Sequence, residues 1–192
     1  MADLTRLDRG RASVADLRGL IDVHVHPPTK EFLMDAGGPH VAAAARKFGH
    51  DLELKTIEEM LDEYFECGVA RLVLFAWDAE TASHRPRVPN EFVARIADKF
   101  PDRIMGFASV DPHKKSSVQV LEYAVKDLKL HGLKLHPQAQ AFEPNDHTYY
   151  PIYAKCVELN VPITFHTGST YWGAVLEGGG GLISAIEPNA SG

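Results

Sequence analysis

The sequence predicts an α/β fold in which parallel strands alternate with helices along one chain. Short apolar or alternating stretches recur at spacings of about 30 residues, and amphipathic helical patterns separate them, as in a series of βα units. Several of the expected strands end on histidine or aspartate. Because parallel strands end at one edge of a sheet, where α/β proteins bind ligands, these polar residues are expected to meet there.

The chain of 192 residues is long enough for one domain with a hydrophobic core, and we divide it into a lead-in over residues 1–19 and a domain over residues 20–192. Its formal net charge of -6 argues against a nucleic-acid partner bound through its phosphates. No apolar run approaches the roughly 20 residues of a membrane helix, and the polar start lacks the apolar core of a signal peptide. We therefore expect a cytoplasmic protein with no membrane partner. Cys67 and Cys156 are expected to be small core residues.

The first expected strand covers residues 20–26 and alternates aliphatic with polar side chains. Its polar face carries Asp22, His24 and His26, and the two histidines point the same way because they are two residues apart. An H-x-H pair on one strand can bind a single divalent metal. The alternative is a buried strand whose histidines make ordinary hydrogen bonds. The opposite, aliphatic face suits burial under helices and consists of Ile21, Val23 and Val25.

The connection over residues 27–55 is long for a compact domain, which favours a lid or a binding loop. Its Arg46 is either a charge on a solvated helix or a contact for a substrate carboxylate. Thr56 and Glu59 then have the spacing of a capping box, and Gly68 is the expected end of the helix that it opens. The expected apolar stripe of this helix is Ile57, Met60, Leu61, Tyr64 and Phe65.

The later elements follow from the same patterns. Strands are expected over residues 71–76, 104–110, 132–137 and 161–166, and helices over 90–100, 117–129 and 149–159, with Asn90 as an N-cap. The segments over 77–89 and 138–148 are expected to be polar loops. Four strand-ending side chains should then converge, namely His26, Asp111, His136 and His166.

Four motifs combine in this order: I-D-V-H-V-H-P (21–27), S-V-D-P-H (109–113), G-L-K-L-H-P-Q-A-Q (132–140) and V-P-I-T-F-H-T-G (161–168). Together they resemble the amidohydrolase-related family of metal-dependent TIM-barrel enzymes, which includes the aminocarboxymuconate-semialdehyde decarboxylase-like group. The resemblance covers residues 20–181 and implies a TIM-barrel-type (β/α)8 fold. About five βα units are present, so we expect an incomplete, C-terminally truncated barrel with an open sheet edge.

The resemblance also implies a divalent metal, most commonly zinc, held by His24, His26 and His166. The later catalytic histidine and metal-binding aspartate of the family have no counterpart in this sequence. The candidate catalytic residues are Asp22, as a partner that orients a ligand imidazole, and His136, which either contacts substrate or caps the loop after its strand. The candidate substrate contacts are Arg46, Lys134 and Trp172. In related two-metal barrels a lysine on this strand is carboxylated and bridges the metals, which is an alternative for Lys134.

Three functions compete at this stage. The first is a hydrolase in which metal-activated water attacks a small amide, lactone or ester. The second uses the same site for non-oxidative decarboxylation of a small unsaturated or aromatic acid. The third is a catalytically inert fragment. Each active form has a small-molecule substrate, and a homo-oligomer that covers the open strand edge is one arrangement left open.

Overall fold

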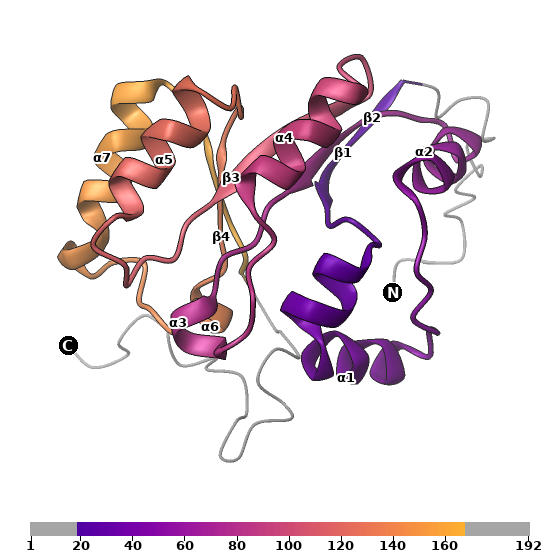
Figure 1. Cartoon of the computed structure of the whole chain (residues 1–192), viewed down its shortest axis with the longest axis horizontal. Coiled ribbons are helices and arrows are strands. Elements are labelled where there is room, and N and C mark those ends of the chain that lie inside the picture. Colours follow the sequence, from indigo (N-terminus) through magenta and orange to yellow (C-terminus); the bar gives the residue numbers. More distant parts are fainter. Residues whose placement is uncertain (1–18, 168–192) are drawn as a thin grey trace, which may run out of the picture.

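The computed structural model describes residues 19–167, apart from the side chains of residues 47 and 48, and contains one parallel sheet (Figure 1). Each strand pairs with the next one along the chain, which is the order of successive strands in a (β/α)8 barrel. The predicted fold class, a TIM-type barrel that is incomplete, is confirmed over the described residues, which contain five parallel strands and the helices between them. The strands are β1 (Leu20–Val25), β2 (Val69–Phe75), β3 (Ile104–Ser109), β4 (Leu133–Leu135) and β5 (Ile163–Phe165).

Helices cover one face of the sheet and also gather at the end where the strands finish. In Figure 1, α4, α5 and α7 lie along the sheet, whereas α1, α3 and α6 lie at its carboxyl end. No helix within residues 19–167 is long and apolar enough to span a bilayer. The helices are α1 (Pro39–Phe48), α2 (Ile57–Glu66), α3 (Glu80–Ser83), α4 (Asn90–Lys99), α5 (Ser117–Lys126), α6 (Pro137–Gln140) and α7 (Tyr150–Leu159), together with a π-helix η2 (Glu31–Gly37) and a 3-10 turn η3 (His147–Tyr149).

The strands have two unlike faces because successive side chains alternate. The outer face packs under the helices in the main core, where Leu72, Leu74 and Ala108 are buried. The inner face, which would line a closed barrel, carries a smaller cluster of Val73, Phe75 and Phe107, with Lys134 beside it. Polar groups of the candidate site therefore stand on the inner face and at its carboxyl edge.

The start of α2 was predicted correctly, but the burial of two residues at its end was not. The capping box is confirmed, since the Thr56 hydroxyl accepts from the Glu59 N–H and the Glu59 carboxylate accepts from the Thr56 N–H. The buried prediction is wrong for Phe65, which is 65% exposed, and for Cys67, which is also exposed. Phe65 lies in the last turn of α2 and Cys67 is its C-cap, whereas the buried residues of this helix lie in its first half.

The predicted burial of the aliphatic face of β1 is wrong at two of three positions. Val25 is 3% exposed, but Ile21 is 58% and Val23 is 63% exposed. The helix that follows, α2, packs mainly against β2. The strand is therefore predicted correctly, but its pairing with β2 shifts register between Leu20 and Ile21 and between Asp22 and Val25, so the strict alternation of its two faces is not kept.

Two segments predicted as polar loops contain helices: residues 77–89 include α3, and the segment after β4 begins with the buried α6. The connection over residues 27–55, for which a solvated helix at Arg46 was one interpretation, contains η2 and α1. The N-cap prediction for Asn90 is also wrong, because the cap position is Pro89. The Asn90 amide instead donates to the Ser109 carbonyl and accepts from the Ser109 N–H, which ties α4 to β3. Of the predicted lead-in, residues 1–18 lie outside the described residues.

Candidate functional site

Four imidazoles from three strands meet at the carboxyl edge of the sheet. The ring centroids of His24 and His26 are 5.5 Å apart, and those of His24 and His166 are 6.3 Å apart. His136 stacks on His166 with centroids 3.9 Å apart and an interplanar angle of 8°. The predicted convergence of β1, β4 and β5 is thus confirmed for the histidines.

Aromatic side chains pack against two of these histidine rings, by stacking and by edge-on contacts. His26 stacks on Phe32 of η2, with centroids 4.3 Å apart and planes 3° from parallel. Trp77, which follows β2, presents its ring edge-on to His26 at 5.6 Å and to His136 at 5.3 Å. The long connection after β1 therefore contributes a wall of the site, as expected of a lid or binding segment.

Lys134 places a cation at the centre of the group. Its side chain is 1% exposed, and Nζ lies 3.2 Å from Nε2 of His24 and 4.9 Å from the centroid of the Phe75 ring. Burial lowers the pKa of Lys134 to about 8. Within residues 19–167 no carboxylate forms an ion pair with it.

Burial and neighbouring charges lower the pKa of three of the four histidines, which favours the neutral form of these rings. Burial is the main cause that lowers the pKa of His24, with further contributions from the charges of Lys134 and His166. Burial likewise holds the pKa of His26 well below its usual value. The pKa of His136 falls to about 2, mainly through burial and then through His166 and Lys134. Neutral imidazole is the form that binds a metal ion.

The donor set fits a divalent metal, although its atoms are not yet arranged around a common point. Nδ1 of His26 is sealed from solvent and has no hydrogen-bond partner among the described residues, so it has an unused lone pair or proton. Across residues 19–167 no three His, Cys, Asp or Glu side chains stand in the geometry of a metal site. Nε2 of His24, one of the nitrogens that would bind the ion, instead has the Lys134 amine 3.2 Å away.

Comparison with known proteins identifies the family. The sequence profile described as Amidohydrolase matches residues 21–188. The chain belongs to the amidohydrolase family.

Solved structures share the fold of this amidohydrolase at low sequence identity. An uncharacterised TIM-barrel protein from Bordetella bronchiseptica has a TM-score of 0.66 and 23% identity, over 80% of this chain and 57% of that one. The 5-carboxyvanillate decarboxylase of Novosphingobium aromaticivorans, solved with manganese and 4-hydroxy-3-methoxy-5-nitrobenzoic acid, has a TM-score of 0.59 and 15% identity, over 80% and 51% of the two chains.

A curated relative matches over a shorter length. The 2-keto-4-carboxy-3-hexenedioate hydratase of a Sphingobium species is 32% identical in an alignment of 90 positions, which covers 42% of this chain and 26% of that protein. The amidohydrolase chain thus spans about a quarter of this relative and a little over half of the solved structures.

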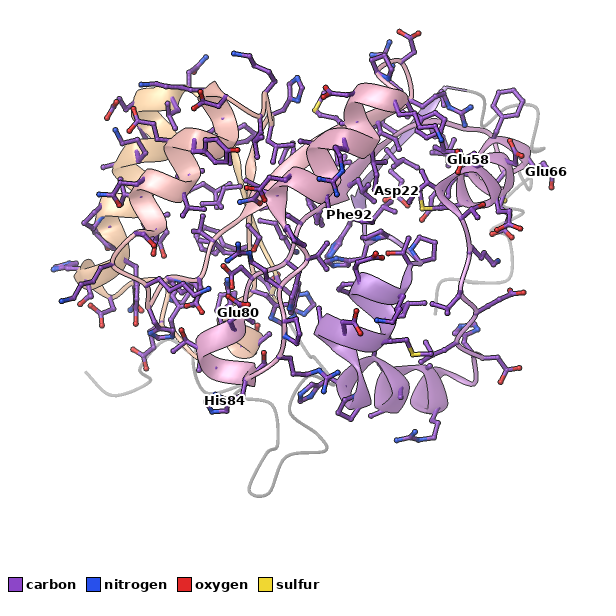
Figure 2. The ribbon with its side chains drawn as sticks, viewed as in Figure 1. Asp22, Glu58, Glu66, Glu80, His84 and Phe92 are labelled. Carbon is purple, nitrogen blue, oxygen red and sulfur yellow. The ribbon has the colours of Figure 1, made fainter. Side chains whose placement is uncertain are left out.

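Other predicted site residues of the amidohydrolase lie apart from the rings. The Asp22 carboxylate accepts from the backbone N–H of His24 at 2.9 Å and from the Tyr64 hydroxyl, where burial and this carboxylate raise the pKa of Tyr64. Figure 2 shows Asp22 beside α2, away from Glu80 at the carboxyl end of the sheet. Asp22 thus holds the main chain of β1 and does not contact a ligand imidazole. Trp172 lies outside the described residues.

Two further predicted residues, Asp111 and Arg46, do not join the histidine cluster in the structure. The Asp111 carboxylate accepts from the N–H groups of Thr81 at 2.7 Å and His113 at 3.0 Å, so it joins the turns after β2 and β3. Arg46 is exposed on α1, and no described hydrogen bond or ion pair joins its side chain to the histidines. Its role as a carboxylate contact stays a prediction.

Three contributors were missed because their sequence context is unremarkable. Phe32 was part of an undivided connection, and Trp77 and Gln140 were placed in polar loops, although they are only 4% and 2% exposed. An H-P-x-x-Q sequence after a strand is the one available signal for Gln140. Its partners are backbone groups of distant segments, which sequence spacing does not reveal.

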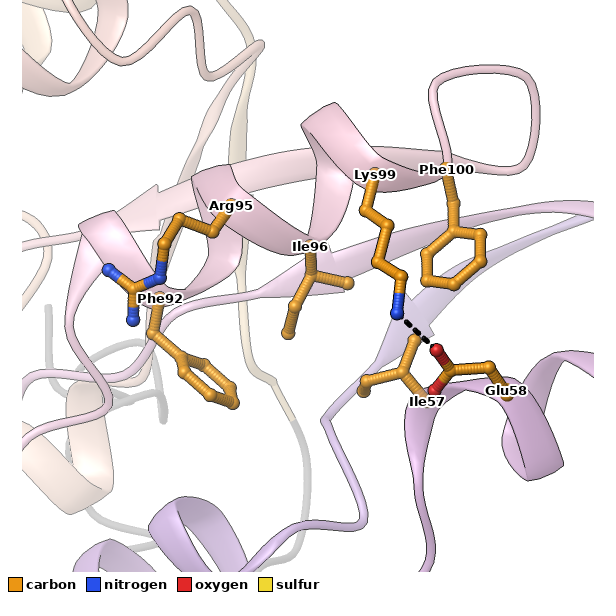
Figure 3. A pocket seen from close by; sticks show the side chains of 7 residues that line it. All are labelled: Ile57, Glu58, Phe92, Arg95, Ile96, Lys99 and Phe100. Atoms are coloured by element: carbon orange, nitrogen blue, oxygen red, sulfur yellow. Dashed lines mark hydrogen bonds and ion pairs between the residues drawn. The ribbon is translucent and has the colours of Figure 1, made fainter.

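A surface cavity of about 210 Å³ lies between α2 and α4, on the helical side of the sheet (Figure 3). Its walls include Ile57, Ile96 and Phe100, and its charged pair, Glu58 and Lys99, is joined by a hydrogen bond. No histidine lines this cavity. The cluster at the carboxyl edge is therefore the better candidate for the active site.

Proposed function

We propose that the chain forms the metal-binding part of an enzyme that acts on a small carboxylic acid, with non-oxidative decarboxylation as the reaction. The observation that carries this proposal is Lys134, a buried amine beside the histidine cluster with no carboxylate partner among the described residues. A buried ammonium group is costly unless it is paired. A carboxylate of the substrate would provide the missing counter-ion.

The walls of the site suit a flat, unsaturated acid. Phe75 lies next to the Lys134 amine, and Trp77 stands edge-on to two of the histidines. Aromatic walls with a few placed polar groups are typical of small-molecule sites. The 5-carboxyvanillate decarboxylase and the hexenedioate hydratase both act, by their names, on small unsaturated or aromatic acids.

His24, His26 and His166 would hold a divalent metal, which supplies Lewis-acid polarisation of a substrate oxygen when bound. Zinc is the expected ion, and manganese in the decarboxylase makes it the first alternative. His136 would face the substrate. Its Nδ1 accepts from the Ala139 N–H at 3.1 Å, so its proton stands on Nε2 and can be donated to a substrate oxygen.

Hydrolysis of a small ester, lactone or amide is the second candidate, because neutral imidazoles around one metal also suit an activated water. An inert fragment is the third. A cytoplasmic location and a small-molecule partner remain predictions of the same proposal.

The test uses the whole 192-residue chain, loaded with Zn²⁺ or Mn²⁺ in separate samples. Release of carbon dioxide is measured over a panel of hydroxylated benzoic and small unsaturated acids, and hydrolysis over a panel of esters and lactones. We expect metal-dependent release of carbon dioxide that His24→Ala abolishes. Lys134→Met should raise KM for the acid about 10- to 100-fold, whereas Lys115→Met, at an exposed lysine, should leave it unchanged.

Ester or lactone hydrolysis without release of carbon dioxide would assign the second candidate. Binding of less than about a tenth of an equivalent of metal, unaffected by His24→Ala, would favour the inert fragment. Normal KM in Lys134→Met would reject the role of this lysine as the carboxylate partner.

A further inference from the structure

We propose that Gln140 is a positioning residue that holds His136 in place at the carboxyl edge of the sheet. The inference rests on the proposed function, because it concerns the histidine that would face the substrate. Gln140 is the last residue of α6 and is 2% exposed. Its role follows from the hydrogen bonds of its side chain and main chain.

The side-chain amide of Gln140 satisfies three backbone groups from three strand ends. Its Nε2 donates to the carbonyl of Asp78 at 2.6 Å, after β2, and to the carbonyl of Val110 at 2.8 Å, after β3. Its Oε1 accepts from the backbone N–H of His136 at 2.8 Å, after β4. One side chain thus fixes the spacing of three neighbouring strands where they carry the site.

The main chain around Gln140 closes a turn on the same histidine. The N–H of Gln140 donates to the His136 carbonyl at 2.9 Å, and the N–H of Ala139 donates to Nδ1 of the His136 ring at 3.1 Å. Since the turn supplies this second donor, its placement decides which ring nitrogen carries the proton. The carbonyl of Gln140 is in turn 2.6 Å from Nε2 of His113.

The position of the His136 ring depends on this turn. The ring stacks on His166 and meets the edge of Trp77, so it is set between the ends of β2 and β5. Without the Gln140 amide, the Asp78 and Val110 carbonyls and the His136 N–H would be left unsatisfied in a buried place. The turn would then have to open to give them partners.

The chemistry of the side chain makes the proposal specific. Glutamate has the shape of glutamine, but an ionised carboxylate has no N–H to donate and would repel the two carbonyls that it faces. Gln140→Glu therefore breaks the contacts to β2 and β3 while it keeps an acceptor for the His136 N–H. Gln119→Glu makes the same chemical change on the exposed face of α5 and serves as the control.

The first measurement needs neither metal nor substrate. A long-range ¹H–¹⁵N spectrum of the whole chain at pH 7 reports the tautomer of His136, whose signals are assigned through His136→Ala. We expect one pattern, protonated at Nε2, in the unmodified chain and in Gln119→Glu. In Gln140→Glu we expect averaging between the two tautomers.

The second measurement applies to the metal-loaded enzyme acting on the acid that it decarboxylates. Loss of positioning should lower kcat about 100-fold in Gln140→Glu. KM and Mn²⁺ affinity should stay within about threefold, which corresponds to less than one kcal/mol, because Lys134 and the three metal-binding histidines are unchanged. A general loss of folding would move all of these quantities together.

A His136 pattern in Gln140→Glu that matches the unmodified chain would overturn the proposal. If Gln140→Glu does not fold, Gln140→Met removes the donors without adding charge and is measured in the same way. Failure of both variants to fold would assign Gln140 a purely structural role and would also overturn it. If no acid is decarboxylated by the unmodified chain, the proposed function fails while the tautomer measurement still tests Gln140.

Discussion

Lys134 shows how one buried side chain sets the electrostatics of the cluster. Its ammonium group stands 3.2 Å from Nε2 of His24, and its charge adds to the effect of burial, which is the main cause of the lowered pKa of His24 and His26. The same charge repels a dication at this place. Lys134→Met keeps a similar volume, so we expect tighter metal binding, by about tenfold, which corresponds to about 1.4 kcal/mol.

Calorimetric titration of the metal-free chain with Zn²⁺ checks this expectation, and Lys115→Met is the matched control at an exposed position. Weaker binding in Lys134→Met would contradict the argument, since it would make the amine a support of the metal site and not a competitor for it.

Gly132 is a second residue whose identity follows from one contact. A Cβ at this position would lie 2.3 Å from Cε2 of Phe107, whose ring belongs to the inner cluster of the sheet. Gly132→Ala should therefore lower the free energy of unfolding by about 1–3 kcal/mol through overpacking. Urea unfolding followed by circular dichroism measures this loss.

The double variant Gly132→Ala with Phe107→Leu tests the cause of the loss. Because the smaller leucine gives the new methyl group room, the two changes together should cost less than the sum of the single changes. Strict additivity of the two costs would show that the strain at Gly132 comes from somewhere other than Phe107.

At the scale of elements, α2 begins at a full capping box, so its stability depends on pH. Hydrogen bonds from the N–H and then the hydroxyl of Thr56 lower the pKa of Glu59. A carboxylate with a lowered pKa stabilises the fold above its unfolded pKa, about 4.5, and this contribution is lost as pH falls through the folded value. Thr56→Ala should cost about 1 kcal/mol at pH 7.

Glu59→Gln isolates the pH-dependent part of this cap. Its thermal midpoint should lie below that of the unmodified chain at pH 7, and the two should approach each other as pH falls below 4. A difference that stays constant from pH 7 to pH 3 would mean that the charge of Glu59 does not contribute to the cap.

The elements that sequence predicted well are those long enough to show a period. The alternation in β1 and the stripe of α2 extend over several residues, so their type and approximate bounds are correct. By contrast, α3 and α6 have four residues each, less than one period and a half of a helix, and were predicted as loops. Their residues are ordered by tertiary contacts that no local pattern encodes.

The site was predictable to the extent that topology determined it. Parallel strands share a carboxyl edge, so His24 and His166 could be brought together although 142 positions separate them. The environment of Gln140 could not be predicted, because a polar residue in a polar stretch indicates solvent. Its buried carbonyl partners at Asp78 and Val110 lie 62 and 30 positions away.

At the scale of the whole molecule, β1 forms an end of the sheet that exposes apolar side chains. Within residues 19–167, β1 and β5 each pair with one neighbour only. Three apolar side chains stand exposed along β1, Leu20 at 45%, Ile21 at 58% and Val23 at 63%. An exposed apolar end strand is prone to pair with another chain, so the expectation of a homo-oligomer that covers this edge has a specific location.

Threonine substitutions at exposed and buried positions of β1 test this location. Threonine retains the β-branched shape that suits a strand while it adds a hydroxyl group. Ile21→Thr with Val23→Thr should reduce association between chains, seen as a smaller weight-average mass in sedimentation at equal concentration. The unfolding midpoint should change little, because both side chains are already in water.

Val25→Thr is the control, because it makes the same chemical change at a buried position of the same strand. Val25 is 3% exposed and belongs to the main core, so burial of its hydroxyl should cost about 1–3 kcal/mol of unfolding free energy. If the paired change at Ile21 and Val23 costs as much as Val25→Thr, the outer face of β1 is covered within the chain itself. If neither stability nor mass responds to it, association between chains does not use this edge of the sheet.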